Sequence, residues 1–203
     1  MLQSLFSKFR WIQDRKIFYG ILGLVWGLGI WSLNGCASSA KPHAVLQVGN
    51  QAPNFDLVDS NGHRFDLYDV KKHWGVILIF YRGSWCEACE DQLLNLKYAY
   101  PKFLKLHFTL AAISTDSIAT SYTFNHECQF PFPLLCDSRL RIIDQYGLRD
   151  PHPNNGKFIS LPATVILEPN HKIYFKYVGK NPLDLPTVNE IINVLKEIRK
   201  TES

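Results

Sequence analysis

Most of this sequence lacks the excess of positive charge that nucleic-acid-binding proteins carry. The formal net charge of the 203 residues is +4. Within residues 1–35 the charged side chains are Lys8, Arg10, Asp14, Arg15 and Lys16. This segment therefore accounts for +3 of the total, and only +1 remains for the rest of the chain. Recognition of a phosphate backbone needs a clustered basic face, so we exclude nucleic acid as a partner.

The sequence also lacks the motifs that hold organic cofactors or structural zinc. No glycine-rich loop of the kind that cradles nucleotide phosphates follows a predicted strand. The five cysteines include one close pair, Cys86 and Cys89, whereas Cys128 and Cys136 are eight residues apart. No paired histidines supply the other two ligands that a structural zinc site would need. We therefore expect neither a bound cofactor nor a metal ion.

A long uncharged segment lies near the start of the chain. The basic stretch that ends at Lys16 is followed by residues 17–33, IFYGILGLVWGLGIWSL. Basic and apolar regions in this order, with a small residue before a cut site, are typical of a secretory signal peptide. Residues 33–36, LNGC, resemble the bacterial lipoprotein signal, and this resemblance implies cleavage before Cys36 and lipidation of its thiol. The alternative is an uncleaved anchor, since ~17 helical residues extend ~26 Å.

Both alternatives place the rest of the chain outside the cytoplasm, because basic residues that flank a membrane segment remain inside. We therefore expect a membrane-tethered protein of the bacterial periplasm or cell envelope, with residues 1–35 as signal peptide or anchor. Residues 36–50 contain Pro42, Gly49 and two adjacent serines. This composition is typical of a flexible tether. The folded domain is then expected to span residues 51–203.

The apolar pattern of that domain predicts an α/β fold. Alternating segments around residues 59–62, DSNG, indicate a β-hairpin at its start. Residues 75–81, GVILIFY, form the continuous apolar run of a strand buried on both faces. From Cys86 onward, apolar residues recur at spacings of three and four, as on one face of a helix. Further strands are expected at 108–114, 133–136, 163–167 and 173–178, and further helices from about 115, at 138–146 and at 187–200. This order predicts a thioredoxin-like fold, a central mixed sheet flanked by helices, with the hairpin added in front.

Two cysteines lie at the junction between the buried strand and the helix after it. Only Glu87 and Ala88 separate Cys86 from Cys89. At a helix N-terminus, free backbone N–H groups and the helix dipole favour a thiolate, so the first cysteine can be nucleophilic near neutral pH. The second cysteine is one turn further along and can close the disulfide that releases a mixed-disulfide partner. We assign catalysis to Cys86 and Cys89, with a half zinc site and an inert structural disulfide as the alternatives.

Four patches of the sequence resemble the peroxiredoxin-like branch of the alkyl hydroperoxide reductase and thiol-specific antioxidant family. They are residues 81–89 (YRGSWCEAC), 132–137 (FPLLCD), 146–148 (YGL) and 161–164 (LPAT), and the resemblance covers residues 48–199. It implies a thioredoxin fold and a thiol-dependent oxidoreductase. It also implies that Pro162 is the proline that in thioredoxin-fold proteins is cis and faces the redox cysteines. Cis peptide bonds are mostly found before proline.

The same resemblance leaves open which sulfur reacts first. It places Cys89 at the peroxidatic cysteine, Cys86 at the usual Thr, and Arg82 at the usual Pro of the peroxidatic loop. A peroxiredoxin uses that Pro and Thr to shape its peroxide pocket, and this sequence lacks both. With Trp85 before Cys86, the site is also similar to the tethered thioredoxin-like reductases of cytochrome maturation, in which Cys86 would attack. We predict faster reduction of disulfides than of hydroperoxides.

Three neighbours of the cysteines are expected to shape the site. The charge of Glu87 disfavours an adjacent thiolate, which raises the thiol pKa and makes the couple more reducing. An acidic residue also suits the first turn of any helix. Arg82 either favours the thiolate or is a solvated residue at the end of a strand. Trp85 is expected to form an apolar wall beside the sulfurs.

Cys128 and Cys136 flank a stiff segment, residues 129–133 (QFPFP). Three interpretations are open for this pair. The two can be plain buried thiols, since free cysteine behaves as a small hydrophobe. They can form a structural disulfide, which an extracytoplasmic setting permits. They can also act as resolving or relay thiols for the Cys86–Cys89 pair.

The sequence therefore predicts an oxidoreductase that cycles Cys86 and Cys89 between dithiol and disulfide. Its substrate is a hydroperoxide or a protein disulfide, and its electrons come from a thiol donor such as a membrane thiol-transfer protein. One rival is a thioredoxin-fold copper-delivery module, in which the two thiolates and a histidine would bind Cu(I). Another is a non-catalytic envelope lipoprotein that keeps the fold as a scaffold.

Overall fold

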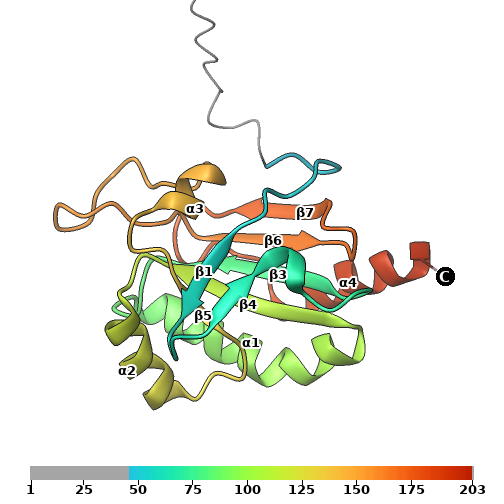
Figure 1. Ribbon diagram of the computed structural model, residues 1–203, viewed down its shortest axis with the longest axis horizontal. Coiled ribbons are helices and arrows are strands. Elements are labelled where there is room, and N and C mark those ends of the chain that lie inside the picture. Colours follow the sequence, from blue (N-terminus) through green and yellow to red (C-terminus); the bar gives the residue numbers. More distant parts are fainter. Residues whose placement is uncertain (1–45, 203) are drawn as a thin grey trace, which may run out of the picture. The chain divides into compact units, whose positions relative to one another are not determined.

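The computed structural model describes residues 46–202, in which strands and helices alternate along the chain (Figure 1). The strands are β1 Asp56–Asp59, β2 Arg64–Asp66, β3 Gly75–Phe80, β4 Phe108–Ser114, β5 Leu134–Cys136, β6 Ala163–Leu167 and β7 Ile173–Val178. The helices are α1 Glu87–Lys105, α2 Ile118–Cys128, α3 Arg141–Gln145 and α4 Val188–Glu202, with a short 3-10 helix, η1, at Leu67–Asp69. The expected signal or anchor, Cys36 and most of the expected tether lie outside the described residues.

The strands form one sheet with both parallel and antiparallel pairs. Within residues 46–202 the order is β2-β1-β5-β4-β3-β6-β7. Strands β3, β4 and β5 are parallel, whereas β1 is antiparallel to β5, β6 to β3, and β7 to β6. The β1–β2 hairpin extends the sheet beyond β5. The predicted thioredoxin-like fold with a mixed sheet and an added N-terminal hairpin is confirmed.

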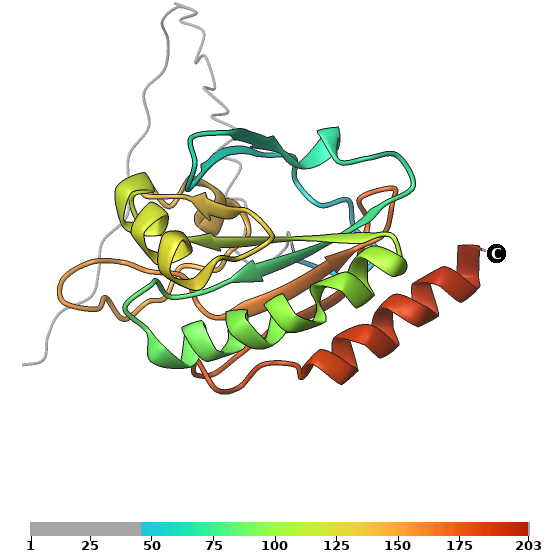
Figure 2. The same ribbon diagram turned by 90° about the horizontal axis from the view of Figure 1, so that it is seen from below.

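The central strand β3 contributes side chains to a core on each face of the sheet. Successive residues of a strand point to opposite faces. Ile77 and Ile79 pack in the core under α1 and α4, which lie side by side on one face (Figure 2). Leu78 and Phe80 belong to the opposite core, which the segment before β1 and helix α3 cover. Burial on both faces explains why residues 75–80 are an unbroken apolar run.

Helix α3 is shorter than the pattern of residues 138–146 predicts. Leu140 adopts a left-handed backbone conformation, φ 55°, and the helix begins only at Arg141. The buried carboxylate of Asp137 satisfies the free N–H groups of this helix start, because it accepts hydrogen bonds from Arg141, Ile142 and Ile143 at 2.8–2.9 Å. Residues 137–140 therefore form a capping turn.

The first described residues are already part of the domain. Leu46 is buried in the core on the α3 side of the sheet. The N–H of Gly49 donates to the carbonyl of Ile173, and the N–H of Ile173 donates to the carbonyl of Asn50. Residues 46–50, which the sequence assigned to the tether, thus pair with the start of β7.

Candidate active site

The predicted redox pair, Cys86 and Cys89, lies where the loop after β3 meets helix α1. Strand β3 ends at Phe80, and α1 begins at Glu87 with Cys86 as its N-cap residue. A disulfide joins Cys86 and Cys89, whose Cα atoms are 5.2 Å apart. The two cysteines thus occupy the helix start at which the sequence placed them, in the geometry that a disulfide requires. Their catalytic role stays a prediction.

The two sulfurs differ in their access to solvent. Cys86 is 6% exposed and Cys89, one turn into the helix, is 1% exposed, and both belong to the core under α1. The backbone N–H groups at the N-terminus of this 19-residue helix favour negative charge there. Glu87 and Glu90 lie in the same first turn and oppose that effect. Cys86 is thus slightly less buried than Cys89 and lies directly at the helix start.

Asp116 holds the redox loop in place. One of its carboxylate oxygens accepts the N–H of Ser84 at 2.8 Å and the hydroxyl of Ser114 at 3.1 Å. The Asp116 N–H in turn donates to the Ser114 hydroxyl oxygen at 3.2 Å. Asp116 was not among the residues predicted from the sequence to shape the site. Its position could have been inferred from the strand order, because Asp116 follows β4 and the carboxyl ends of the parallel strands β3 and β4 meet at one edge of the sheet.

Trp85 is exposed beside the cysteine pair, and its expected role as an apolar wall beside the sulfurs stays a prediction. Its side chain is 51% exposed although it directly precedes Cys86. The guanidinium carbon of Arg82 lies 5.1 Å from the centre of its ring, a cation–π contact. Gly83, at φ 149°, permits this arrangement, because a Cβ there would come within 2.5 Å of the indole nitrogen. Arg82 thus supports the tryptophan beside the redox pair.

Pro162 lies at the expected end of the sheet with a trans peptide bond. Ala163, the next residue, pairs with Phe80, so Pro162 is at the same edge as the redox loop. No peptide bond among residues 46–202 is cis, and the expectation of a cis Pro162 is wrong. The backbone enters β6 directly, with the Leu161 N–H bonded to the Leu148 carbonyl and the Pro162 carbonyl accepting from Gly179. The trans form is also the intrinsic preference of X–Pro bonds.

Cys128 and Cys136 are free thiols, so the structural disulfide that the sequence left open is not formed. The Cys128 sulfur donates to the Glu90 carboxylate at 3.6 Å, and the Cys136 sulfur donates to the Ser121 hydroxyl at 3.4 Å. Burial, followed by the charge of Glu90, raises the pKa of Cys128 to about 11. Burial also raises the pKa of Cys136. Both thiols are therefore protonated and weakly nucleophilic near neutral pH.

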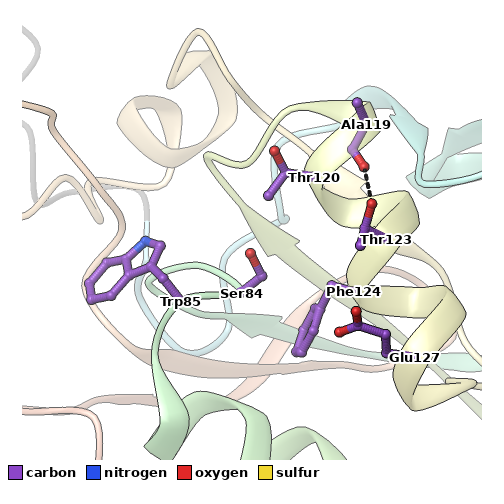
Figure 3. A pocket seen from close by; sticks show the side chains of 7 residues that line it. All are labelled: Ser84, Trp85, Ala119, Thr120, Thr123, Phe124 and Glu127. Carbon is purple, nitrogen blue, oxygen red and sulfur yellow. Dashed lines mark hydrogen bonds between the residues drawn. The ribbon is translucent and has the colours of Figure 1, made fainter.

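Two open pockets flank Trp85 at this edge of the sheet. One, of about 510 Å³, lies between the redox loop and one side of α2, and Figure 3 shows Trp85, Ser84 and Phe124 around it. The other, of about 680 Å³, extends from Trp85 to the loop that precedes β6. Thr120 lines both. Both pockets thus reach Trp85, the residue directly before Cys86, and each has room for more than a small peroxide.

Membrane-spanning helices and metal clusters are absent from the described part of the chain. Among residues 46–202, no helix combines the length and the apolar character that crossing a bilayer requires. In the same range, His, Cys, Asp and Glu side chains do not gather in groups of three or more that would hold a metal ion.

Known proteins resemble this chain in sequence over most of its length. Residues 48–176 match the AhpC/TSA family. Over 188 residues the chain is 27% identical to the thiol-disulfide oxidoreductase ResA of Bacillus subtilis (strain 168), covering 91% of this chain and 96% of that protein. It is 24% identical over 170 residues to the selenocysteine-containing peroxiredoxin PrxU of Peptoclostridium acidaminophilum, covering 78% and 83%.

Solved structures agree on the fold. The peroxiredoxin 6 of Arenicola marina superposes with a TM-score of 0.71 at 18% identity, covering 78% of this chain and 76% of that one. The peroxidoxin BcpB of Mycobacterium tuberculosis superposes with a TM-score of 0.66 at 20% identity, covering 77% and 99%. Fold and relatives define an enzyme of the thiol-dependent oxidoreductase class. Within that class, the chain belongs to the AhpC/TSA family.

Proposed function

We propose that this protein is an extracytoplasmic thiol-disulfide oxidoreductase that cycles Cys86 and Cys89 between dithiol and disulfide. The observation that carries the proposal is the disulfide between these residues at the N-terminus of α1, with Cys86 as the more exposed sulfur. A helix N-terminus stabilises the thiolate that such chemistry needs. Trp85 and Glu87, the neighbours of Cys86 in the chain, are both exposed, and Arg82 is half-buried. Their exposure supports a site that a partner can approach.

The reaction transfers two electrons and two protons to a partner disulfide. The Cys86 thiolate attacks one partner sulfur, forms a mixed disulfide and expels the other partner sulfur, which takes up a proton. Cys89 then loses its proton and attacks the Cys86 sulfur, which forms the Cys86–Cys89 disulfide and releases the second partner thiol. A dithiol donor reverses these steps and restores the reduced enzyme, and a membrane thiol-transfer protein on the same side of the membrane would fit this role.

The difference in burial supports this order of the two sulfurs. A partner sulfur must approach the attacking thiolate in line, and Cys86 is the less buried of the two cysteines. Cys89 needs to meet only its neighbour one turn back, at a Cα separation of 5.2 Å. Burial under α1 is therefore compatible with a resolving role for Cys89.

Reduction of hydroperoxides is the second candidate, and family membership is the observation that favours it. In that reaction the Cys89 thiolate would attack the peroxide, release an alcohol or water, and become a sulfenic acid. Cys86 would then condense with it to form the same disulfide and a water molecule. Arg82 and Cys86 stand where the family's usual Pro and Thr shape the peroxide pocket, so we expect this activity to be the slower one.

The location outside the cytoplasm rests on residues 1–36, which lie outside the described structure. Their basic start, apolar run and lipoprotein-like LNGC sequence support a lipid or helical anchor. On this basis we divide the chain into a signal or anchor at residues 1–35, a tether, and the redox domain after the tether. ResA of Bacillus subtilis aligns over 91% of this chain, so the similarity extends into this leading region.

The test is a pair of turnover measurements on the full chain in detergent. The reduced protein is mixed with a small disulfide-bonded protein or with hydrogen peroxide, and a dithiol donor is supplied for repeated cycles. We expect faster turnover with the disulfide and loss of turnover in Cys86→Ser. A copper-delivery module or a non-catalytic scaffold would turn over neither substrate. Absence of turnover with both substrates would therefore overturn the proposal.

A further inference from the structure

The loop between α3 and β6 forms a firm arm beside the redox pair, although the redox chemistry does not require it. Its base is closed by a bridge between Arg149 and Ser160 and by the Asp150 N–H bonded to the Ile159 carbonyl at 2.9 Å. At its tip, Asn154 and Lys157 exchange both backbone hydrogen bonds at 2.9 Å. We call residues 150–158 the recognition arm.

The tip of the recognition arm is a tight two-residue turn. Asn155 and Gly156 both have positive φ angles, 49° and 74°, the combination that a type I′ hairpin turn requires and that an Asn-Gly pair favours. The Arg149 guanidinium also lies 4.9 Å from the ring centre of Phe158. These contacts fix the arm before any partner arrives, which lowers the entropic cost of binding.

The recognition arm and Trp85 form two sides of one pocket. This pocket of about 680 Å³ is lined mostly by hydroxyl and amide side chains, namely Thr115, Ser117, Thr120, Ser138, Asn154 and Asn155. Its size falls in the range of sites for ligands much larger than a hydroperoxide, ~300–1,000 Å³. Uncharged donors and acceptors beside an exposed aromatic ring suit the backbone amides and side chains of an extended polypeptide.

Charge distinguishes the two ends of this pocket. Its charged lining residues are Asp116 and Lys157. The Asp116 carboxylate is engaged by Ser84 and Ser114. The Lys157 ammonium group is exposed and has no side-chain partner among residues 46–202. A carboxylate on the bound polypeptide would therefore complement this end of the pocket.

We propose that the recognition arm and Trp85 bind the polypeptide segment that carries the substrate disulfide, and that Lys157 selects segments with an acidic side chain near the cystine. This inference rests on the proposed function and names the partner surface for it. Docking along the pocket places the segment next to the residue that directly precedes Cys86. Specificity for protein disulfides then comes from the arm, and reactivity comes from the cysteine pair.

The test compares the full chain with Lys157→Glu and with the matched control Lys72→Glu. Lys72 is exposed and precedes β3, whose far end leads to the redox loop, so its charge reversal is equal in size and distant from the pocket. The substrates are a synthetic cystine peptide with two flanking aspartates, the same peptide with asparagines, and the small neutral disulfide of 2-mercaptoethanol. Each kcat/KM is measured at low and high salt.

We expect the unmodified protein and Lys72→Glu to prefer the aspartate peptide by about three- to fivefold, as a partly exposed ion pair would give, and to lose this preference at high salt. In Lys157→Glu the preference should vanish or reverse, while the small disulfide reacts at the same rate. Equal rates for both peptides in the unmodified protein, or a preference that survives Lys157→Glu, would overturn the inference. Failure to reduce even the small disulfide would instead overturn the proposed function.

Discussion

The carboxylate of Asp116 accepts a hydrogen bond from the backbone N–H of Ser84 at 2.8 Å, two residues before Cys86. The same oxygen accepts the Ser114 hydroxyl, so the end of β4 and the redox loop share one acceptor. The Asp116 carboxylate therefore helps to fix the conformation of the loop. The loop cannot move without breaking a charge-assisted hydrogen bond.

Replacement of Asp116 by Ala should loosen the redox loop. We expect the free energy of unfolding to fall by about 1–2 kcal/mol, because a hydrogen bond to a charged acceptor is lost and the Ser84 N–H loses its partner. Disulfide reduction should slow as well. Urea unfolding and the rate with a small disulfide measure the two effects. Asp116→Asn, which keeps an acceptor oxygen, should restore most of both, and equal losses in the two variants would contradict a positioning role.

Gln92, on α1 one turn beyond Cys89, buries polar atoms without partners. Neither its amide nitrogen nor its amide oxygen has a hydrogen-bond partner within the described residues. Leaving such groups unsatisfied costs free energy, whereas an apolar residue of similar size does not pay that penalty. Gln92→Leu should therefore leave the free energy of unfolding unchanged or raise it by about 1 kcal/mol. A clear loss of stability in urea unfolding would mean that the amide makes a contact that this account lacks.

The reactivity of Cys128 should depend on pH and on Glu90. Because burial and the Glu90 carboxylate raise the pKa of Cys128 to about 11, its thiolate is scarce at neutral pH and becomes abundant only as the pH approaches that value. Alkylation by iodoacetamide, followed by peptide mass spectrometry, should be slow at pH 7 and rise steadily to pH 11. Glu90→Gln removes the neighbouring charge, so it should lower this pKa and speed alkylation at pH 8. An unchanged rate in that variant would exclude Glu90 as a cause.

Cys36 is predicted to carry the lipid that tethers the protein. Palmitate labelling of cells that express the full chain should mark the unmodified protein and leave Cys36→Ser unlabelled. The variant should also retain its first 35 residues, because lipoprotein signal peptides are cleaved before the lipidated cysteine. Labelling that persists in Cys36→Ser would favour the uncleaved anchor.

The fold could be predicted because its strongest signals are local. The run at residues 75–80 indicates a strand buried on both faces, and the spacing after Cys86 indicates a helix packed on one face. The place of the Cys86–Cys89 pair at the junction of this strand and helix was predictable for the same reason. Each of these features depends only on residues that are close together in the sequence.

The contacts that surround the redox pair could not be predicted in the same way. The bond between Asp116 and Ser84 joins residues 32 apart, and it depends on the parallel pairing of β3 with β4. The pocket beside Trp85 depends on the recognition arm, which reaches the redox loop only through the placement of β6 next to β3. The trans peptide bond before Pro162 was also not predictable, because a resemblance in four residues, LPAT, does not determine the peptide geometry.

The central claim, that Cys86 attacks a disulfide and Cys89 resolves it, is tested most directly by trapping the mixed disulfide. Reduced Cys89→Ser and reduced Cys86→Ser, each as the full chain, are mixed with a small disulfide-bonded protein, and the adducts are mapped by mass spectrometry. We predict a stable mixed disulfide at Cys86 in Cys89→Ser and little or none at Cys89 in Cys86→Ser. An adduct that forms only at Cys89, together with rapid sulfenic acid formation there by hydrogen peroxide, would contradict the account and make Cys89 the leading sulfur of a peroxidase.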